Sequence, residues 1–174
     1  MHNALSSAAP FPVTTVSRLG GGTLTLGKPE TADWQLILVY RGLHCPICRG
    51  YMEDLEPRLS EFAEIGIEVV IVSADPVEKA EKLRADHAPT VPIGFDLSIA
   101  QMKMLGLYVS APRTPQETDR PYAEPGLFLV NPEGHLHMVD ISNAPFLRPE
   151  LDKLPARIKF VLDNDHPIRG TYDG

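Results

Sequence analysis

Two residues of this chain, Cys45 and Cys48, could carry redox or metal chemistry, and they are its only cysteines. They stand in the stretch RGLHCPICRG, separated by Pro46 and Ile47. Cysteines at this spacing can bind a metal ion, pack as an inert pair or form a reactive dithiol. A structural zinc site normally has four ligands, and only scattered histidines could complete one, at positions 2, 44, 87, 135, 137 and 166. We favour the dithiol over the other two interpretations and expect no metal ion or other cofactor.

The sequence around the cysteines predicts a strand followed by a helix. Residues 35–40 (QLILVY) form an apolar run typical of a buried strand, and residues 46–65 have apolar positions at three- and four-residue spacing. Cys45 then lies at the helix start, where free N–H groups and the helix dipole lower the pKa of a thiol. Cys48 lies one turn later, with the two Cα atoms roughly 5–6 Å apart, a separation that a disulfide accepts. We predict that Cys45, as an accessible thiolate, attacks a disulfide or a peroxide and that Cys48 resolves the product.

Charged and rigid neighbours of the pair are candidate substrate-binding residues. Arg41, Arg49 and a protonated His44 would add positive charge near the sulfur, and Arg41 could also hold an anionic substrate group. Simple solvation at the strand end is an equal alternative for Arg41, and His44 could be only a partly exposed neighbour. Pro46 stands near the helix start, where its missing N–H has no cost.

Composition and charge limit the class of protein. The chain has 174 residues, the size of one domain, and its formal net charge is −7 without any run of basic residues. This balance argues against nucleic acid and anionic lipid as partners, because both need concentrated positive charge. No apolar stretch approaches the roughly 20 residues that cross a bilayer. The first 13 residues lack the pattern of a secretory signal, so we expect a cytoplasmic protein.

The remaining pattern predicts an α/β fold with helices on both faces of a central sheet. Residues 1–19 are expected to form an N-terminal arm, residues 20–163 the domain and residues 164–174 a C-terminal tail. The proline-rich residues 106–125 are expected to form a long loop. Proline residues 57 and 155 should kink the helices that contain them. Strands are predicted at 23–26, 35–40, 67–73, 91–95, 126–130 and 135–141, and helices at 46–65, 76–87, 98–105 and 149–162.

Several segments resemble a known family. VYRGLHCPICRGYMEDL resembles the active site of the thioredoxin superfamily. The segments IEVVIVSADPVEKAEKLRADH, VPIGFDLSIAQMKMLGL and PGLFLVNPEGHL are similar to the peroxiredoxin-like branch, which is related to the alkyl hydroperoxide reductase / thiol-specific antioxidant (AhpC/TSA) family. The resemblance covers about residues 20–163. It implies a thioredoxin-like fold with a central mixed sheet.

The resemblance also implies roles for individual residues. The attacking cysteine of the family falls on Cys45 and the resolving cysteine on Cys48. The cis-proline that faces the active site in thioredoxin-like folds falls on Pro125, which Glu124 precedes. We expect Pro125 and its neighbouring backbone to hold an extended substrate segment.

The chain departs from the family pattern at several positions. The peroxiredoxin motif P-x-x-x-[TS]-x-x-C would require proline at Leu38 and threonine or serine at Gly42. Peroxiredoxins also carry an arginine on the late strand where this chain has Pro125. Thioredoxins bury an acid six residues before the first cysteine, and here that position is Val39. These departures leave more than one activity open.

The leading hypothesis is a thiol–disulfide oxidoreductase of peroxiredoxin-like type. The second is an antioxidant thiol peroxidase in which Arg41, Arg113 or Arg120 replaces the missing arginine. The third is a redox-sensing interaction module that uses the proline-rich loop. The expected partners are a protein or small-molecule disulfide or a hydroperoxide, and a thiol reductant such as a thioredoxin or glutathione system. A homodimer is compatible with each hypothesis.

Overall fold

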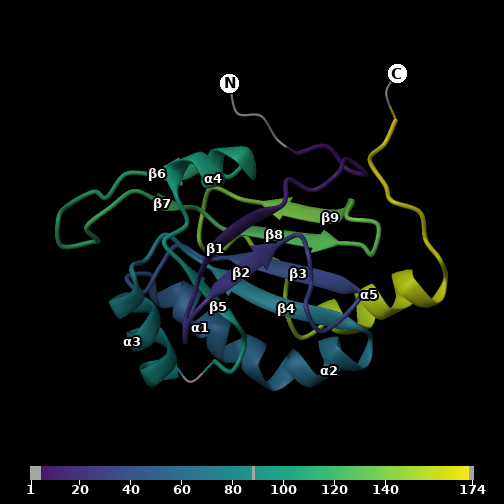
Figure 1. Cartoon of the computed structure of the whole chain (residues 1–174), viewed down its shortest axis with the longest axis horizontal. Coiled ribbons are helices and arrows are strands. Elements are labelled where there is room, and N and C mark those ends of the chain that lie inside the picture. The colour runs from purple at the N-terminus through teal and green to yellow at the C-terminus, as the bar shows by residue number, and fades with distance from the viewer. Residues whose placement is uncertain (1–4, 88, 173–174) are drawn as a thin grey trace.

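A mixed β-sheet forms the centre of the molecule in the computed structural model, which describes residues 5–87 and 89–172 (Figure 1). Over these residues the main sheet has seven strands in the order β2-β1-β5-β4-β3-β8-β9. Its central strands, β3 (Trp34–Val39), β4 (Ile67–Val72) and β5 (Ile93–Phe95), are parallel. The hairpin of β8 (Gly126–Val130) and β9 (Leu136–Ile141) adds antiparallel strands beside β3. The predicted mixed sheet is therefore confirmed.

Helices cover both faces of the sheet, as the sequence predicts. The side chains of β3 alternate: Leu36 and Leu38 face one apolar cluster, and Ile37 and Val39 face the other. The first cluster includes residues of four helices that lie together below the sheet in Figure 1. These helices are α1 (Pro46–Leu55), α2 (Leu59–Glu64), α3 (Val77–His87) and α5 (Leu154–Asp163).

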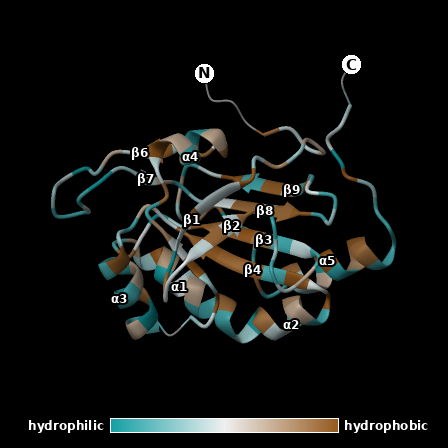
Figure 2. Ribbon diagram, in the orientation of Figure 1, coloured by the Kyte–Doolittle hydropathy of each residue, from teal (hydrophilic) through white to brown (hydrophobic). Residues whose placement is uncertain are grey.

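The second cluster lies on the opposite face, where Met102 of α4 (Ile99–Met104) packs with buried residues of β1 and β2, which belong to the same sheet. Figure 2 shows the central strands mostly in hydrophobic colours, whereas the helices alternate between apolar and polar residues. This alternation is the amphipathic pattern that identifies them in the sequence. None of the helices in the described residues is long and apolar enough to cross a membrane.

Pro57 interrupts the helix predicted over residues 46–65. The chain forms α1, a short 3-10 turn over Glu56–Arg58 and then α2. A proline inside a helix lacks the N–H that would continue the hydrogen-bond ladder, so the predicted kink is confirmed. Pro155 behaves differently, because α5 begins at Leu154 and Pro155 lies in its first turn, where no kink is needed.

Two segments of the chain contain strands where the sequence predicts arm or loop. Thr14–Arg18 forms β1, which pairs with β2 (Thr23–Leu26) and β5 although residues 1–19 were expected to form an arm. This strand has a single buried residue, Val16, so its pattern is too weak to identify a strand. Within the loop of residues 106–125, β6 (Val109–Ser110) pairs with β7 (Tyr122–Ala123).

The contact between α2 and the sheet can be tested by shortening Phe62. This ring is fully buried in the helix-covered cluster, so Phe62→Ala should lower the free energy of unfolding by about 3–5 kcal/mol. The matched control is Phe160→Ala, since Phe160 is 59% exposed and its loss should change stability by about 0.5 kcal/mol or less. Urea denaturation measures both, and equal effects of the two variants would contradict the assigned core.

Candidate active site

Cys45 is the N-cap residue of α1. Its backbone is extended, and its Sγ accepts a hydrogen bond from the backbone N–H of Cys48 at 3.3 Å. Pro46 follows as the first helical residue, where its fixed φ suits the helix start. The sulfur therefore receives one of the N–H groups that a helix leaves unpaired at its start. The predicted placement of both cysteines is confirmed, and both are free thiols.

The two cysteines are more buried than the sequence analysis predicts. Cys45 is 2% exposed and Cys48 is fully buried, so the expectation of an accessible thiolate is wrong. The reason is the apolar face of α1, because Cys48, Met52 and Leu55 recur at helical spacing and pack against β3. Cys45 joins the same cluster at the edge of this face.

Arg41 supplies positive charge to Cys45. Its Nη1 lies 3.9 Å from the Sγ of Cys45, and its Nη2 donates a hydrogen bond to the hydroxyl of Tyr122 at 2.7 Å. Its Nε lies 3.1 Å from a carboxylate oxygen of Glu124. The other oxygen of Glu124 accepts a hydrogen bond from the hydroxyl of Ser110 at 2.6 Å. The sequence-predicted residues Arg41 and Glu124 thus meet, and the carboxylate holds the guanidinium beside the sulfur.

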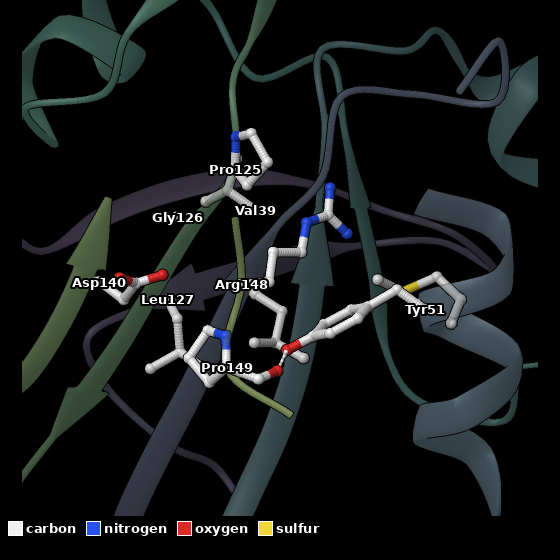
Figure 3. A pocket seen from close by; sticks show the side chains of 10 residues that line it. Val39, Tyr51, Pro125, Gly126, Leu127, Asp140, Arg148 and Pro149 are labelled. Atoms are coloured by element: carbon white, nitrogen blue, oxygen red, sulfur yellow. Dashed lines mark hydrogen bonds between the residues drawn. The ribbon is translucent and has the colours of Figure 1, made fainter. Parts of the chain in front are cut away.

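Arg148, a residue not predicted from the sequence, approaches the second sulfur. Its Nη2 donates a hydrogen bond to the Sγ of Cys48 at 2.8 Å. Its guanidinium lies 4.9 Å from the ring centroid of Tyr51. The hydroxyl of Tyr51 in turn donates to the carbonyl of Pro149 at 2.9 Å, the dashed line in Figure 3. No local sequence signal links Arg148 to Cys48, because they are separated by 100 residues.

The pKa values of the two thiols move in opposite directions. The hydrogen bond from the side chain of Cys48 is the largest cause that lowers the pKa of Cys45, to about 6. Burial opposes this shift, while the backbone N–H of Cys48 and the charge of Arg41 add to it. Burial raises the pKa of Cys48, and the hydrogen bond to Cys45 raises it further. These opposite shifts favour a pair in which Cys45 carries the negative charge and Cys48 keeps its proton.

His44 does not supply the predicted positive charge. Burial lowers its pKa, and the neighbouring charge of Arg41 lowers it further, so the imidazole is neutral at neutral pH. Its ring packs 4.6 Å from the ring of Tyr122. Both ring nitrogens are buried and make no hydrogen bond to any residue that the structure describes.

Gly42 occupies the position where the peroxiredoxin motif has threonine or serine, and its surroundings explain the departure. A Cβ atom at residue 42 would lie 2.7 Å from a carboxylate oxygen of Asp75, and the φ of +139° favours glycine. The other oxygen of Asp75 accepts a hydrogen bond from the backbone N–H of Leu43 at 2.7 Å. Burial raises the pKa of Asp75. This buried carboxyl group takes the space of the missing side chain.

Pro125 is not the cis-proline that the resemblance implies. The described residues contain no cis peptide bond. The backbone on both sides is already hydrogen-bonded, because the N–H of Glu124 donates to Tyr108 and the carbonyl of Pro125 accepts from Ser142. Pro125 nevertheless lies near α1, since it lines a narrow cavity with Tyr51 (Figure 3).

This cavity is also lined by Arg148, whose Nη2 reaches the Sγ of Cys48. Arg148 extends between Tyr51 and the Pro125–Gly126 segment, as Figure 3 shows. The volume of the cavity is about 10 Å³, which is room for about one water molecule. An organic substrate would need the surrounding side chains to move.

Of the three arginines considered as a replacement, only Arg41 contacts Cys45 within the described part of the chain. Arg113 is exposed and pairs with Glu117. Arg120 pairs with Asp96 and Asp119, each at 3.0 Å. In the same part of the chain no cluster of three or more histidine, cysteine or acidic residues could hold a metal ion.

Comparisons with known proteins agree with the fold. The model of the AhpC/TSA family matches residues 8–139. A search of curated proteins gives no match. Among solved structures, AhpC of Mycobacterium tuberculosis is 17% identical with a TM-score of 0.75, and the match covers 94% of this chain and 96% of that one. A mutant of peroxiredoxin 6 of Arenicola marina is 15% identical with a TM-score of 0.78, and its match covers 92% and 74%. These structures share the fold.

The close approach at Gly42 can be tested with two glycine variants. Gly42→Ala should lower the free energy of unfolding by about 1–3 kcal/mol, because the new Cβ meets the carboxylate of Asp75 at a strained φ. Gly50→Ala is the control, since Gly50 lies in α1 with open space around it. That variant should leave stability unchanged or raise it by up to about 1 kcal/mol. Urea denaturation compares them, and a Gly42→Ala protein as stable as the unchanged one would contradict the assignment.

The ionisation of Cys45 should follow its lowered pKa. Its thiolate should form with a midpoint near pH 6, which thiolate absorbance measures as a function of pH. The pKa of Cys45 in the folded protein lies below its ordinary value, so ionisation of Cys45 stabilises the fold. This contribution is complete when the pH is above the ordinary thiol pKa, and it is lost as the pH falls through about 6. Cys48→Ala should raise the midpoint, and Cys45→Ser should remove it. A midpoint at the ordinary thiol value of about 8.5 would refute the shift.

Proposed function

We propose that this chain, which belongs to the AhpC/TSA family, reduces small hydroperoxides at the Cys45–Cys48 pair. Membership of this family supports thiol-dependent peroxidase or oxidoreductase activity. The observation that carries this proposal is a sulfur with a lowered pKa, beside Arg41, that is only 2% exposed. A small oxidant can approach such a sulfur more readily than a folded protein with a disulfide can. Solved structures of the same fold are named peroxiredoxins, which agrees with this choice.

The first step is attack of the Cys45 thiolate on the terminal oxygen of the hydroperoxide. The S–O bond forms as the O–O bond breaks, so that Cys45 becomes a sulfenic acid and the substrate leaves as an alcohol after taking up a proton. Arg41 is the group best placed to stabilise the negative charge as it moves to the leaving oxygen. Glu124 and Tyr122 keep the guanidinium in position.

The second step is resolution by Cys48. Its sulfur attacks the sulfur of the sulfenic acid, a disulfide forms, and the hydroxyl group leaves as water with the proton of Cys48. The two residues are one helical turn apart and their side chains interact, which is the proximity that this step needs.

An external dithiol then completes the cycle. It reduces the Cys45–Cys48 disulfide by exchange and is itself oxidised to a disulfide. A thioredoxin or glutathione system in the cytoplasm would provide this reductant. Ile47, which is exposed between the two cysteines, and Pro46 would be the first residues that such a partner meets. His44, Arg41, Glu124 and the backbone near Pro125 complete the proposed substrate-binding set.

Thiol–disulfide oxidoreduction of other proteins is the second candidate. The observation that favours it is the pairing of a thiolate at a helix start with a protonated thiol one turn later, an arrangement suited to disulfide exchange. This reaction requires the start of α1 to open, because the disulfide of a protein substrate must reach the buried sulfur of Cys45. Hydroperoxide reduction needs a smaller opening.

Turnover of the cysteine variants tests the proposed function. Peroxide consumption with an excess of dithiol should fall to the background rate in Cys45→Ser. Cys48→Ser should still react once with peroxide, because it keeps the attacking sulfur, and should accumulate sulfenic acid that a dimedone-type reagent traps. Peroxide consumption no faster than that of the free dithiol, combined with rapid reduction of a protein disulfide, would replace the proposal by the second candidate.

A further inference from the structure

Arg148, the arginine beside Cys48, differs from Arg41 in having no carboxylate partner among the described residues. Glu124 neutralises Arg41 at 3.1 Å. Among the residues that the structure describes, no carboxylate lies within ion-pair distance of Arg148, and its buried Nε has no hydrogen-bond partner. Its near neighbours are the sulfur of Cys48 and the ring of Tyr51. This half-buried cation therefore lacks a counter-ion while Cys48 is protonated.

We propose that Arg148 acts directly in the resolving step: it becomes the counter-ion of the Cys48 thiolate once Cys45 has been oxidised. This inference rests on the proposed function in assigning Cys48 as the resolving thiol. It adds a residue that comes from the segment after β9 and that neither the CPIC motif nor α1 contains.

The reduced pair favours ionisation of Cys45 over ionisation of Cys48. While Cys45 is a thiolate, its charge and its hydrogen bond with Cys48 add to burial and keep Cys48 protonated. Oxidation to sulfenic acid, or formation of a mixed disulfide, makes Cys45 neutral and removes both of these causes. Burial still opposes ionisation of Cys48, but Arg148 lies at 2.8 Å to stabilise the thiolate.

The other groups that face Cys48 do not supply this charge. The other charged or titratable groups that act on Cys48 are Cys45, at the N-cap of α1, and Tyr40 and Arg41, which follow β3. Tyr51 of α1 packs against the same apolar cluster. The backbone N–H of Arg41 also favours the Cys48 thiolate, but the guanidinium of Arg41 is paired with Glu124. Asp140 of β9 lines the cavity beside Arg148 and carries the opposite sign.

Two contacts hold Arg148 in this position. Its guanidinium lies over the ring of Tyr51 at 4.9 Å, and the hydroxyl of Tyr51 donates to the carbonyl of Pro149, the next residue in the chain. Figure 3 shows the arginine extended from its segment between Tyr51 and Pro125. The helix α1 thus carries both Cys48 and Tyr51, the aromatic residue that orients the guanidinium of Arg148.

A two-step thiol reaction can test the role without any peroxide. Methyl methanethiosulfonate is small: the Cys45 thiolate attacks its sulfenyl sulfur, gains an S–S–CH₃ group and releases methanesulfinate. The Cys48 thiolate then attacks the Cys45 sulfur, the Cys45–Cys48 disulfide forms and methanethiolate leaves. Acid quenching followed by intact mass spectrometry resolves the adduct from the disulfide, so each step has its own rate.

The informative variants are Arg148→Met, Arg148→Lys and the control Arg157→Met, in which an exposed arginine of α5 is replaced. Arg148→Met should slow the second step about 10- to 100-fold, as expected for the loss of a charge-assisted hydrogen bond. It should also move the pH profile of that step to higher pH, while the first step stays at the rate of the control. Arg148→Lys, which keeps the charge, should be intermediate.

Two outcomes would overturn the inference. One is an Arg148→Met protein, folded by circular dichroism, that resolves the adduct at the unchanged rate and with the unchanged pH profile. The other is an equal slowing of both steps, which indicates only a general disturbance of the site. Failure of the proposed function has a separate signature, because the unchanged protein would then form and resolve the adduct but would not consume peroxide.

Discussion

The structure of the site depends on where one negative charge is held between two sulfur atoms. The start of α1 presents an unpaired N–H to the sulfur of Cys45, and the thiol of Cys48 interacts with it from the next turn. The same interaction that lowers the pKa of Cys45 raises that of Cys48, so the two thiols cannot be equally reactive. The opposite pKa shifts follow from a contact across a single helical turn, and they favour the proposed roles of Cys45 as attacking and Cys48 as resolving residue.

Because both thiols are buried, their different ionisation also depends on charged residues from other parts of the chain. A charge in the closed cluster under the sheet needs compensation, and Arg41 gives it to Cys45 from the end of β3. Glu124, which precedes β8, holds Arg41 in turn. On the other side, Asp75 takes the space beside Gly42 that a motif threonine would occupy. At and near the positions where the chain departs from the peroxiredoxin motif, Arg41, Glu124 and Asp75 supply the polar groups around Cys45.

Much of the fold could be predicted from the sequence because its elements have strong local patterns. The apolar run of β3, the helical spacing of Cys48, Met52 and Leu55, and the proline that divides α1 from α2 each act within a few residues. The strand β1 could not be found in this way, since it buries only Val16. The expected cis bond at Pro125 came from resemblance to a family and not from the residues, and the local hydrogen bonds of this chain accommodate a trans bond.

The sequence by itself determined the chemistry that is available: a dithiol at a strand-to-helix junction, with the first sulfur at the helix start. Only the tertiary structure decided how that dithiol is surrounded. It showed that both thiols are buried, that burial and Arg41 lower the pKa of His44 and that Arg148 reaches Cys48 across 100 residues of chain. The physical reason is the range of the interactions. Periodicity and capping are properties of neighbouring residues, whereas burial and charge compensation depend on elements that meet only when the sheet and its helices have packed.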